Sequence, residues 1–155
     1  MRTFGFAALA CVLLLPTALR AQRERLSPDE VAYVEKTWPN AKKTSTGIRY
    51  VIERQGHGQP PNPGDKVFVL YVGKLLNGHV FDKVQDPNNP FTFRVDRYSV
   101  IEGWDQTMET MKVGEKRLVV IPSELAYGTT GQRPNIPPDS ALIFEIELLK
   151  IERVQ

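Results

Sequence analysis

The sequence is poor in the residues that carry metal, thiol and nucleophile chemistry. Cys11 is its single cysteine, and its two histidines, His57 and His79, stand at no metal-ligand spacing. No serine lies in a nucleophile elbow, and no glycine-rich phosphate loop opens a helical pattern. Asp82 and Asp86, four residues apart in a predicted loop, give only weak support to paired-carboxylate catalysis. We therefore expect no metal and no cofactor, and little supports a hydrolase or a transferase.

Long apolar runs are also missing, except at the N-terminus. Residues 1–3 are a short basic stretch, residues 4–15 are apolar throughout, and Ala21 is a small residue at a suitable cleavage position. This pattern predicts a signal peptide over residues 1–21, too short to span a bilayer, and thus an exported protein, periplasmic or extracellular. Leu9-Ala10-Cys11 resembles a lipoprotein cleavage box, but apolar sequence continues through Leu15. We favour a Cys11 that lies inside the signal peptide and carries no lipid.

An excess of charge of one sign is absent as well. Cleavage after Ala21 would remove Arg2 and Arg20 from a chain with 20 basic and 18 acidic residues, and would leave no net charge. A neutral domain is a poor partner for nucleic acid. The mature chain would also have no cysteine and so no disulfide. We expect a monomer without stable membrane insertion.

Residues 22–46 read as a polar N-terminal segment that carries one short helix. Ser27 is a good N-cap, Pro28 suits the first helical position, and Glu30 completes a capping box. Pro39 ends the helical pattern after Trp38. We predict a spacer, either packed on the following domain or mobile, and the alternative is a dimerisation arm.

From Gly47 onward the pattern predicts β-strands. Asn77-Gly78 is a strong hairpin turn, and two further short strands are predicted in "PFTFRV" and "KRLVVIP". The final stretch, "ALIFEIELLKIE", alternates most clearly, with one apolar face opposite Glu145 and Glu147. That apolar face consists of Leu142, Phe144, Ile146 and Leu148.

One amphipathic helix interrupts the strands, in the stretch "VIEGWDQTMETM" (residues 100–111). At helical spacing, Ile101, Trp104, Met108 and Met111 form one apolar stripe. The economical packing is an α+β domain over residues 47–155, in which a twisted five- to six-stranded antiparallel sheet wraps around this helix. Trp104 is then either core filler or the floor of a pocket, and the stripe alone favours the core.

Residues 56–152 resemble a complete FKBP-type peptidyl-prolyl cis–trans isomerase domain. The resemblance rests on "GDKVFVLYVGKLLNGHVFD", "PFTFRV", "VIEGWDQTMETMKVGEKRLVVIP", "ELAYGTTG" and "IPPDSALIFEIELL", which follow one another in the family's order and spacing. A single "NG" or "AYG" would mean little, but the ordered set is specific. The family's FKBP-like fold, a five- or six-stranded antiparallel sheet around one short helix, agrees with the architecture predicted from the pattern.

The resemblance also implies a site. In this family the tryptophan of the "GW" step lies flat beneath the prolyl ring, which assigns that place to Trp104. The other catalytic positions implied are Tyr71, Phe81, Asp82, Tyr127 and Phe144, and the substrate-binding ones are Phe91, Val100, Ile101 and Ile136. The Tyr127 hydroxyl and the Ile101 backbone N–H are implied donors to a substrate or inhibitor carbonyl. The implied partners are proline-containing segments of unfolded proteins, together with macrolide inhibitors.

Four residues depart from the common family pattern, namely Pro87, Asp96, Gln132 and Asn135. They bear on macrolide affinity and sequence preference more than on activity. Two functions therefore stand: a prolyl isomerase that assists the folding of exported proteins, and an FKBP-like chaperone that holds peptides with little or no turnover.

Overall fold

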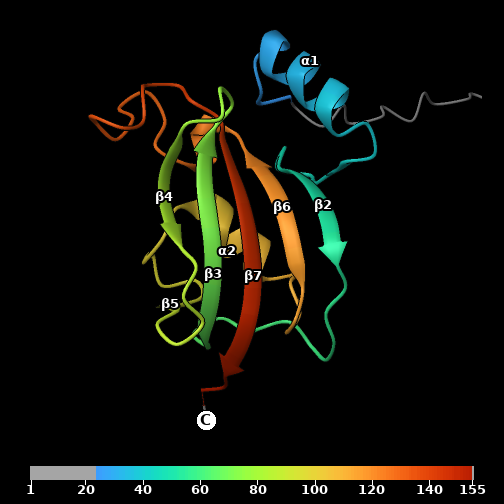
Figure 1. Cartoon of the computed structure of the whole chain (residues 1–155), viewed down its shortest axis with the longest axis vertical. Coiled ribbons are helices and arrows are strands. Elements are labelled where there is room, and N and C mark those ends of the chain that lie inside the picture. The colour runs from blue at the N-terminus through green and yellow to red at the C-terminus, as the bar shows by residue number, and fades with distance from the viewer. Residues whose placement is uncertain (1–23, 155) are drawn as a thin grey trace, which may run out of the picture.

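The fold is an antiparallel sheet curved around one short helix (Figure 1). A computed structural model describes residues 24–154, so the predicted signal peptide lies outside the described residues. The main path of the sheet is β1 (Lys42–Lys43), β2 (Arg49–Arg54), β6 (Lys116–Ile121), β7 (Leu142–Glu152), β3 (Lys66–Leu75) and β4 (Val80–Val84). A seventh strand, β5 (Phe91–Arg94), also pairs with β3. The α+β, FKBP-like fold is confirmed, and the two-residue β1 accounts for the strand beyond the expected six.

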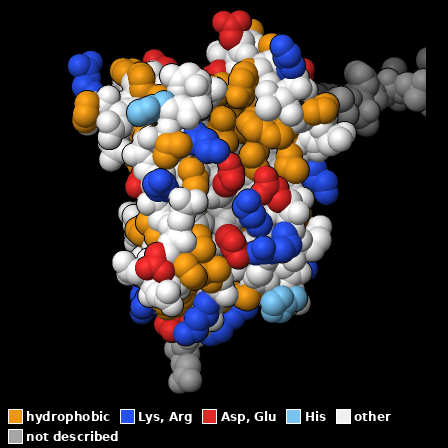
Figure 2. All heavy atoms as spheres, in the orientation of Figure 1, with side chains coloured by type: hydrophobic (Ala, Val, Ile, Leu, Met, Phe, Trp, Pro, Cys, Tyr) orange, Lys and Arg blue, Asp and Glu red, His pale blue; other side chains and the backbone are white. Residues whose placement is uncertain are grey.

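The two faces of the sheet follow the predicted alternation. In β7, Leu142, Phe144, Ile146 and Leu148 are buried on the face toward the central helix. Glu145 and Glu147 point to the outer face. There Glu145 pairs with Lys74 of β3 and Lys116 of β6, and Glu147 pairs with Arg54 of β2, two strands away. Figure 2 shows acidic and basic side chains intermixed across the middle of this face. The sheet thus buries one face and exposes a charged one.

The central helix, α2 (Glu102–Met108), is shorter than the apolar stripe that predicts it. Trp104, Met108 and Met111 are all buried, as predicted, but after Met108 the chain continues as turns with i→i+3 hydrogen bonds. Gly103 lets the helix approach β6, because a Cβ there would overlap the Ile121 side chain. The helix therefore lies close against the sheet and fixes the depth of Trp104.

A buried ion pair at the start of β6 is hydrogen-bonded to the turn that follows α2. Arg117 donates from Nε to Glu115 Oε1 at 2.6 Å, and both side chains are almost fully buried. The same guanidinium donates to the Thr110 hydroxyl at 2.7 Å and to the Thr110 carbonyl at 3.2 Å. Arg117 therefore bonds the turn that follows α2 to the sheet and satisfies a carbonyl that the helix leaves unpaired.

The predicted N-terminal helix is α1 (Pro28–Thr37), with Ser27 as N-cap and a complete capping box to Glu30. It lies at one end of the sheet (Figure 1), where Leu26 and Val34 are buried in a second apolar cluster with residues of β6 and β7. That cluster contains Leu118, Val120, Ala141 and Ile143. None of the helices among residues 24–154 is long and apolar enough to cross a bilayer.

Candidate active site

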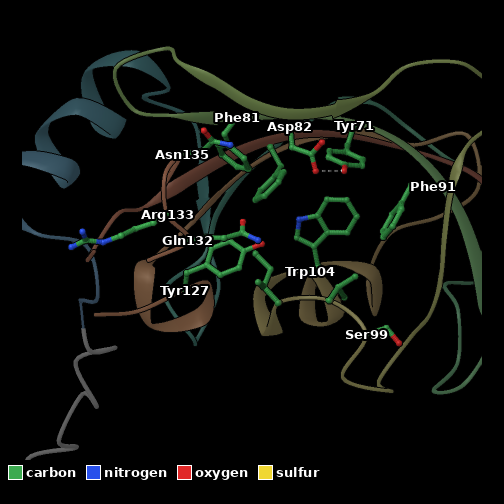
Figure 3. Close-up of a pocket in the computed structure, with 13 residues that line it drawn as sticks. Tyr71, Phe81, Asp82, Phe91, Ser99, Trp104, Tyr127, Gln132, Arg133 and Asn135 are labelled. Carbon is green, nitrogen blue, oxygen red and sulfur yellow. Dashed lines mark hydrogen bonds between the residues drawn. The ribbon is translucent and has the colours of Figure 1, made fainter. Parts of the chain in front are cut away.

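A cavity of about 440 Å³ opens on the concave side of the sheet, above α2 (Figure 3). Side chains reach it from β3, β4, β5, β7, α2 and the loops on either side. Its lining residues are Tyr71, Phe81, Asp82, Phe91, Ser99, Val100, Ile101, Trp104, Tyr127, Gln132, Arg133, Asn135 and Phe144. Five elements that are separated in the sequence, together with loop residues, therefore build one concave aromatic site, the usual form of a small-ligand pocket.

Trp104 lies at the base of the cavity and is only 4% exposed. Its indole is in edge-to-face contact with the rings of Tyr71, Phe144 and Phe91, at centroid distances of 5.0, 5.2 and 5.9 Å. Such contacts are typical of aromatic clusters and hold each ring in one orientation. Trp104 is thus both part of the core and the floor of the cavity.

A glycine makes room for the aromatic wall. Phe81 and Phe144 meet edge to face at a centroid distance of 5.6 Å directly over Gly73 of β3. A Cβ at Gly73 would come within 2.7 Å of the Phe81 ring and 2.8 Å of the Phe144 ring. The absence of a side chain at this position therefore allows both rings to close onto the strand.

The carboxylate of Asp82 is held by a hydrogen bond inside the cavity. The Tyr71 hydroxyl donates to Asp82 Oδ2 at 2.6 Å, and the Lys83 backbone N–H donates to Oδ1 at 2.8 Å. Burial, with a further contribution from this bond to Asp82, raises the pKa of Tyr71 well above its usual range. Tyr71 therefore stays protonated at any physiological pH and keeps the carboxylate in a fixed orientation.

Two hydrogen-bond donors of the cavity, the Tyr127 hydroxyl and the Ile101 N–H, have no hydrogen-bond partner within residues 24–154. Burial, followed by the charge of Asp82, raises the pKa of Tyr127, so its hydroxyl also keeps its proton. Ile101 is the N-cap residue of α2, and within residues 24–154 its backbone N–H donates to no backbone carbonyl. Because Ile101 is in the extended conformation, this N–H is not part of the helix.

The structure brings together nine of the ten residues that the family resemblance implies, all except Ile136. Ile136 does not line the cavity. Its side chain is 1% exposed and packs in the main core, and its backbone pairs with Gln132 across the loop. From the sequence, an apolar residue beside two prolines is expected at the rim of the cavity. In the structure the loop directs the Ile136 side chain into the core instead.

Sequence reasoning also missed two lining residues, Ser99 and Arg133. Gln132 and Asn135, identified in sequence only as polar departures from the family, line the cavity as well. For Ser99, the sequence signal of a place in the cavity was its position directly before Val100, one of the implied substrate-binding residues. Figure 3 shows the Arg133 side chain directed away from Trp104, so its contribution comes from the part near the backbone. Within residues 24–154, no three histidine, cysteine or acidic side chains are grouped to hold a metal ion.

Comparison with known proteins shows the same domain. Residues 57–149 match the family model described as FKBP-type peptidyl-prolyl cis-trans isomerase. The chain is 45% identical over 122 residues to FK506-binding protein 4 of Dictyostelium discoideum, which covers 77% of this chain and 33% of that protein. It is 41% identical over 140 residues to the FKBP-type 22 kDa peptidyl-prolyl cis-trans isomerase of Escherichia coli, covering 86% and 66%.

Solved structures agree with these sequence matches. The crystal structure of FkpA from Escherichia coli has a TM-score of 0.72 at 39% identity, over 81% of this chain and 58% of that one. A peptidyl-prolyl cis-trans isomerase from Pseudomonas syringae has a TM-score of 0.71 at 37% identity, over 81% and 92%. The chain spans one third to two thirds of the two curated relatives described above. With the family model matched across most of the described domain, the chain belongs to the FKBP-type peptidyl-prolyl cis–trans isomerases.

Proposed function

We propose that this protein is a peptidyl-prolyl cis–trans isomerase that accelerates rotation about X–Pro amides while exported proteins fold. One observation carries the proposal: an aromatic cavity whose floor is Trp104 holds an oriented carboxylate, Asp82, and a free hydroxyl, Tyr127. The reaction needs no nucleophile, metal or cofactor, because no covalent bond is made or broken.

The chemistry requires a surface that prefers a twisted amide to a planar one. Rotation about a peptide bond crosses a barrier of about 20 kcal/mol and takes about 10–100 s for an X–Pro bond without a catalyst. The planar amide is the more dipolar form, so transfer from water into an aromatic cavity disfavours it more than the twisted form. An acceleration of about 10⁵-fold would require about 7 kcal/mol of such differential binding.

The polar groups of the cavity supply the remaining differential binding. We assign the Tyr127 hydroxyl and the Ile101 N–H as donors to substrate carbonyls, since both line the cavity and both are free. Asp82 adds a fixed negative charge on one wall. Because rotation about the C–N bond reorients the substrate carbonyl dipole, this charge interacts differently with the planar and twisted amides.

The substrates we propose are proline-containing segments of unfolded chains, with a large apolar residue before the proline. Phe81 lies on the cavity wall beside the carboxylate of Asp82, so an apolar side chain is buried there and an acidic one is repelled. The proposed exported location rests on the sequence of residues 1–21. Mass spectrometry of the exported protein tests that location by the expected N-terminus near Gln22.

The decisive experiment is a protease-coupled isomerase assay with peptides that contain Leu-Pro or Glu-Pro. We expect catalysis of both, with kcat/KM about tenfold higher for Leu-Pro, which corresponds to part of the 1.5–3 kcal/mol for full burial of such a side chain. Asp82→Val should lose at least about tenfold in kcat/KM and unfold near the wild-type midpoint. Equal rates for the two peptides would contradict the preference. No catalysis, with aggregation of an unfolded client still suppressed, would instead establish the chaperone.

A further inference from the structure

The N-terminal segment touches both ends of the loop that carries one wall of the cavity. We call residues 24–34 the strap, and residues 126–141 the cavity loop, which contributes Tyr127, Gln132, Arg133 and Asn135 to the lining. Before the loop, Glu124 in the short 3₁₀ helix η1 (Ser123–Leu125) pairs with Arg25 of the strap at 3.4 Å. At the end of the loop, the backbone N–H of Ala141 donates to Glu30 Oε1 at 3.1 Å.

The contact at Ala141 is the stronger of the two. The Glu30 carboxylate uses both oxygens, one for Ala141 and one for the Ser27 N–H at 2.8 Å within the capping box. Ala141 is 2% exposed and lies in the apolar cluster formed with Leu26 and Val34 of the strap. The Arg25–Glu124 pair is partly exposed, and such pairs contribute little. The end of the loop is thus held by a buried apolar contact together with a charge-assisted hydrogen bond.

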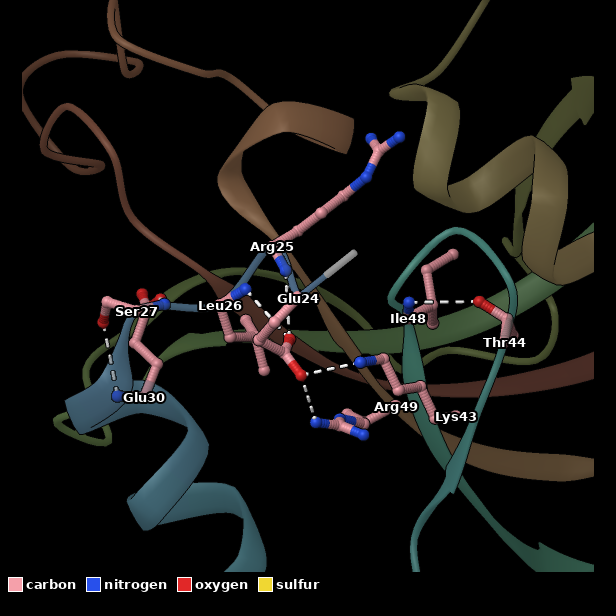
Figure 4. A network of polar contacts seen from close by, with 9 residues as sticks. All are labelled: Glu24, Arg25, Leu26, Ser27, Glu30, Lys43, Thr44, Ile48 and Arg49. Atoms are coloured by element: carbon pink, nitrogen blue, oxygen red, sulfur yellow. Dashed lines mark hydrogen bonds and ion pairs between the residues drawn. The ribbon is translucent and has the colours of Figure 1, made fainter. Parts of the chain in front are cut away.

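The strap is itself anchored to the sheet, so it can act as a support. Glu24 Oε2 accepts hydrogen bonds from Lys43 of β1 and Arg49 of β2, both at 2.7 Å (Figure 4). Burial opposes ionisation of Glu24, but the bonds to Lys43 and the backbone and the charge of Arg49 outweigh it and lower its pKa. Glu24 therefore remains charged at neutral pH, and the strap joins one edge of the sheet to the cavity loop.

We propose that the strap positions the cavity loop for substrate, and that Glu30 is the positioning residue through which it acts. Glu30 is not among the residues that line the cavity. It holds Ala141, the last residue of the cavity loop, and so limits how far the loop and its Tyr127 can move away from Trp104. The inference rests on the proposed isomerase function. A loosened loop must be ordered again on binding, which raises KM and leaves kcat nearly unchanged.

The test compares Glu30→Ala with Glu35→Ala in the purified protein. Glu35 is an exposed acid on the same helix, so the two variants lose the same charge from the same element. We expect Glu30→Ala to raise KM for a Leu-Pro peptide about three- to tenfold, the size of one net hydrogen bond, with kcat within about twofold. Glu35→Ala should match the wild type. Both are assayed well below their unfolding midpoints, so that loss of folded protein does not contribute.

A conservative variant keeps the test informative if Glu30→Ala does not fold. Glu30→Gln retains one acceptor oxygen for two N–H groups, so its KM should fall between those of the wild type and Glu30→Ala. A change in kcat with KM unaltered, or an equal effect of Glu35→Ala, would overturn the positioning role.

Amide hydrogen exchange provides a readout that does not depend on activity. In Glu30→Ala the amides of Ala141 and of the cavity loop should exchange at least about tenfold faster than in the wild type, whereas amides of β3 should not change. Unchanged exchange at Ala141 and in the cavity loop would refute the positioning role of the strap even if the protein is an isomerase. Faster exchange in a protein without isomerase activity would refute the proposed function and leave the mechanical role of the strap in place.

Discussion

At the scale of single residues, the two tyrosine hydroxyls of the cavity differ in whether they are already hydrogen-bonded within the protein. The Tyr71 hydroxyl is bonded to Asp82 and belongs to the fixed frame of the site. The Tyr127 hydroxyl lines the cavity, and no hydrogen bond contributes to its raised pKa. We expect removal of the Tyr71 hydroxyl to release the Asp82 carboxylate from its fixed orientation, and removal of the Tyr127 hydroxyl to affect only what the protein binds. Substitution at Tyr127 therefore isolates function from folding.

Tyr127→Phe should lower kcat/KM for a Leu-Pro peptide by roughly tenfold, because one hydrogen bond to the substrate carbonyl is worth about 1–1.5 kcal/mol. The unfolding midpoint should stay near that of the wild type, since the ring remains. A protease-coupled assay and a urea titration check the two halves. Full activity in this variant would remove Tyr127 from the proposed mechanism.

Trp104→Leu is the contrasting change, because the indole serves the core and the cavity at once. We expect a loss of about 2–4 kcal/mol in the free energy of unfolding, from the space left among the rings of Tyr71, Phe91 and Phe144. Activity should fall as well. Two-state denaturant curves beside the isomerase assay measure both, and a stable variant with normal activity would show that the indole is dispensable.

At the scale of elements, the sequence pattern located α2 well but not its end. The spacing of Trp104, Met108 and Met111 predicts their burial correctly. It cannot show that the chain leaves the helix after Met108, or that Arg117, from a strand later in the chain, bonds the turn that follows. The capping box of α1, by contrast, is entirely local, and both of its hydrogen bonds form as predicted. The sequence thus predicts hydrogen bonds between residues close together in the chain, but not polar contacts between residues far apart in it.

Arg117→Met should destabilise the domain by about 3–5 kcal/mol, because it leaves the Glu115 carboxylate buried without its cation. The double variant Arg117→Met/Glu115→Gln should recover part of this loss. Glutamine is neutral and still accepts from the Lys112 N–H, which donates to Glu115 in the wild type. Chemical denaturation of the three proteins tests the coupling, and additive losses would argue against it.

Asp105→Asn should change the pH dependence of stability. Burial, and then the charge of Asp96, raises the pKa of Asp105, so the folded state holds this proton more tightly than the unfolded state. Ionised Asp105 therefore costs stability at neutral pH, and that cost disappears as the pH falls through its folded pKa. The asparagine still accepts the Asp96 N–H. The Asp105→Asn variant should therefore have a free energy of unfolding higher than that of the wild type by on the order of 0.5 kcal/mol at pH 7, and the difference should shrink at acidic pH.

At the scale of the whole molecule, the sequence predicts the sheet, the helix and most of the cavity, because alternation and family motifs are continuous in the chain. It does not predict how the N-terminal segment meets the loop before β7, since the Glu30–Ala141 bond joins residues 111 positions apart. It also misplaced Ile136, because the direction of a loop side chain depends on how the loop folds back. The contacts that the sequence does not predict are those of residues outside any periodic apolar pattern.

The purified mature protein should sediment as a monomer across the micromolar range. The apolar face of α1 is already covered by the sheet of its own chain, through Leu26 and Val34. Tyr33 is the one large apolar side chain of α1 that stays exposed, which is too little for a stable apolar contact with a partner, and the balanced charge offers no long-range attraction. Sedimentation equilibrium measures the mass. A dimer that forms with rising concentration would support the alternative that residues 22–46 are a dimerisation arm.

The edges of the sheet have a consequence for a protein that works among unfolded chains. One edge is β1, only two residues long and both lysine, and the other is divided between β4 and β5, of five and four residues. Long flat edges invite added strands and so nucleate aggregation. Short, charged and interrupted edges give a client chain no continuous backbone ladder to join. Under the proposed function, a client would therefore be held by its side chains at the cavity and could leave once its X–Pro bond has rotated.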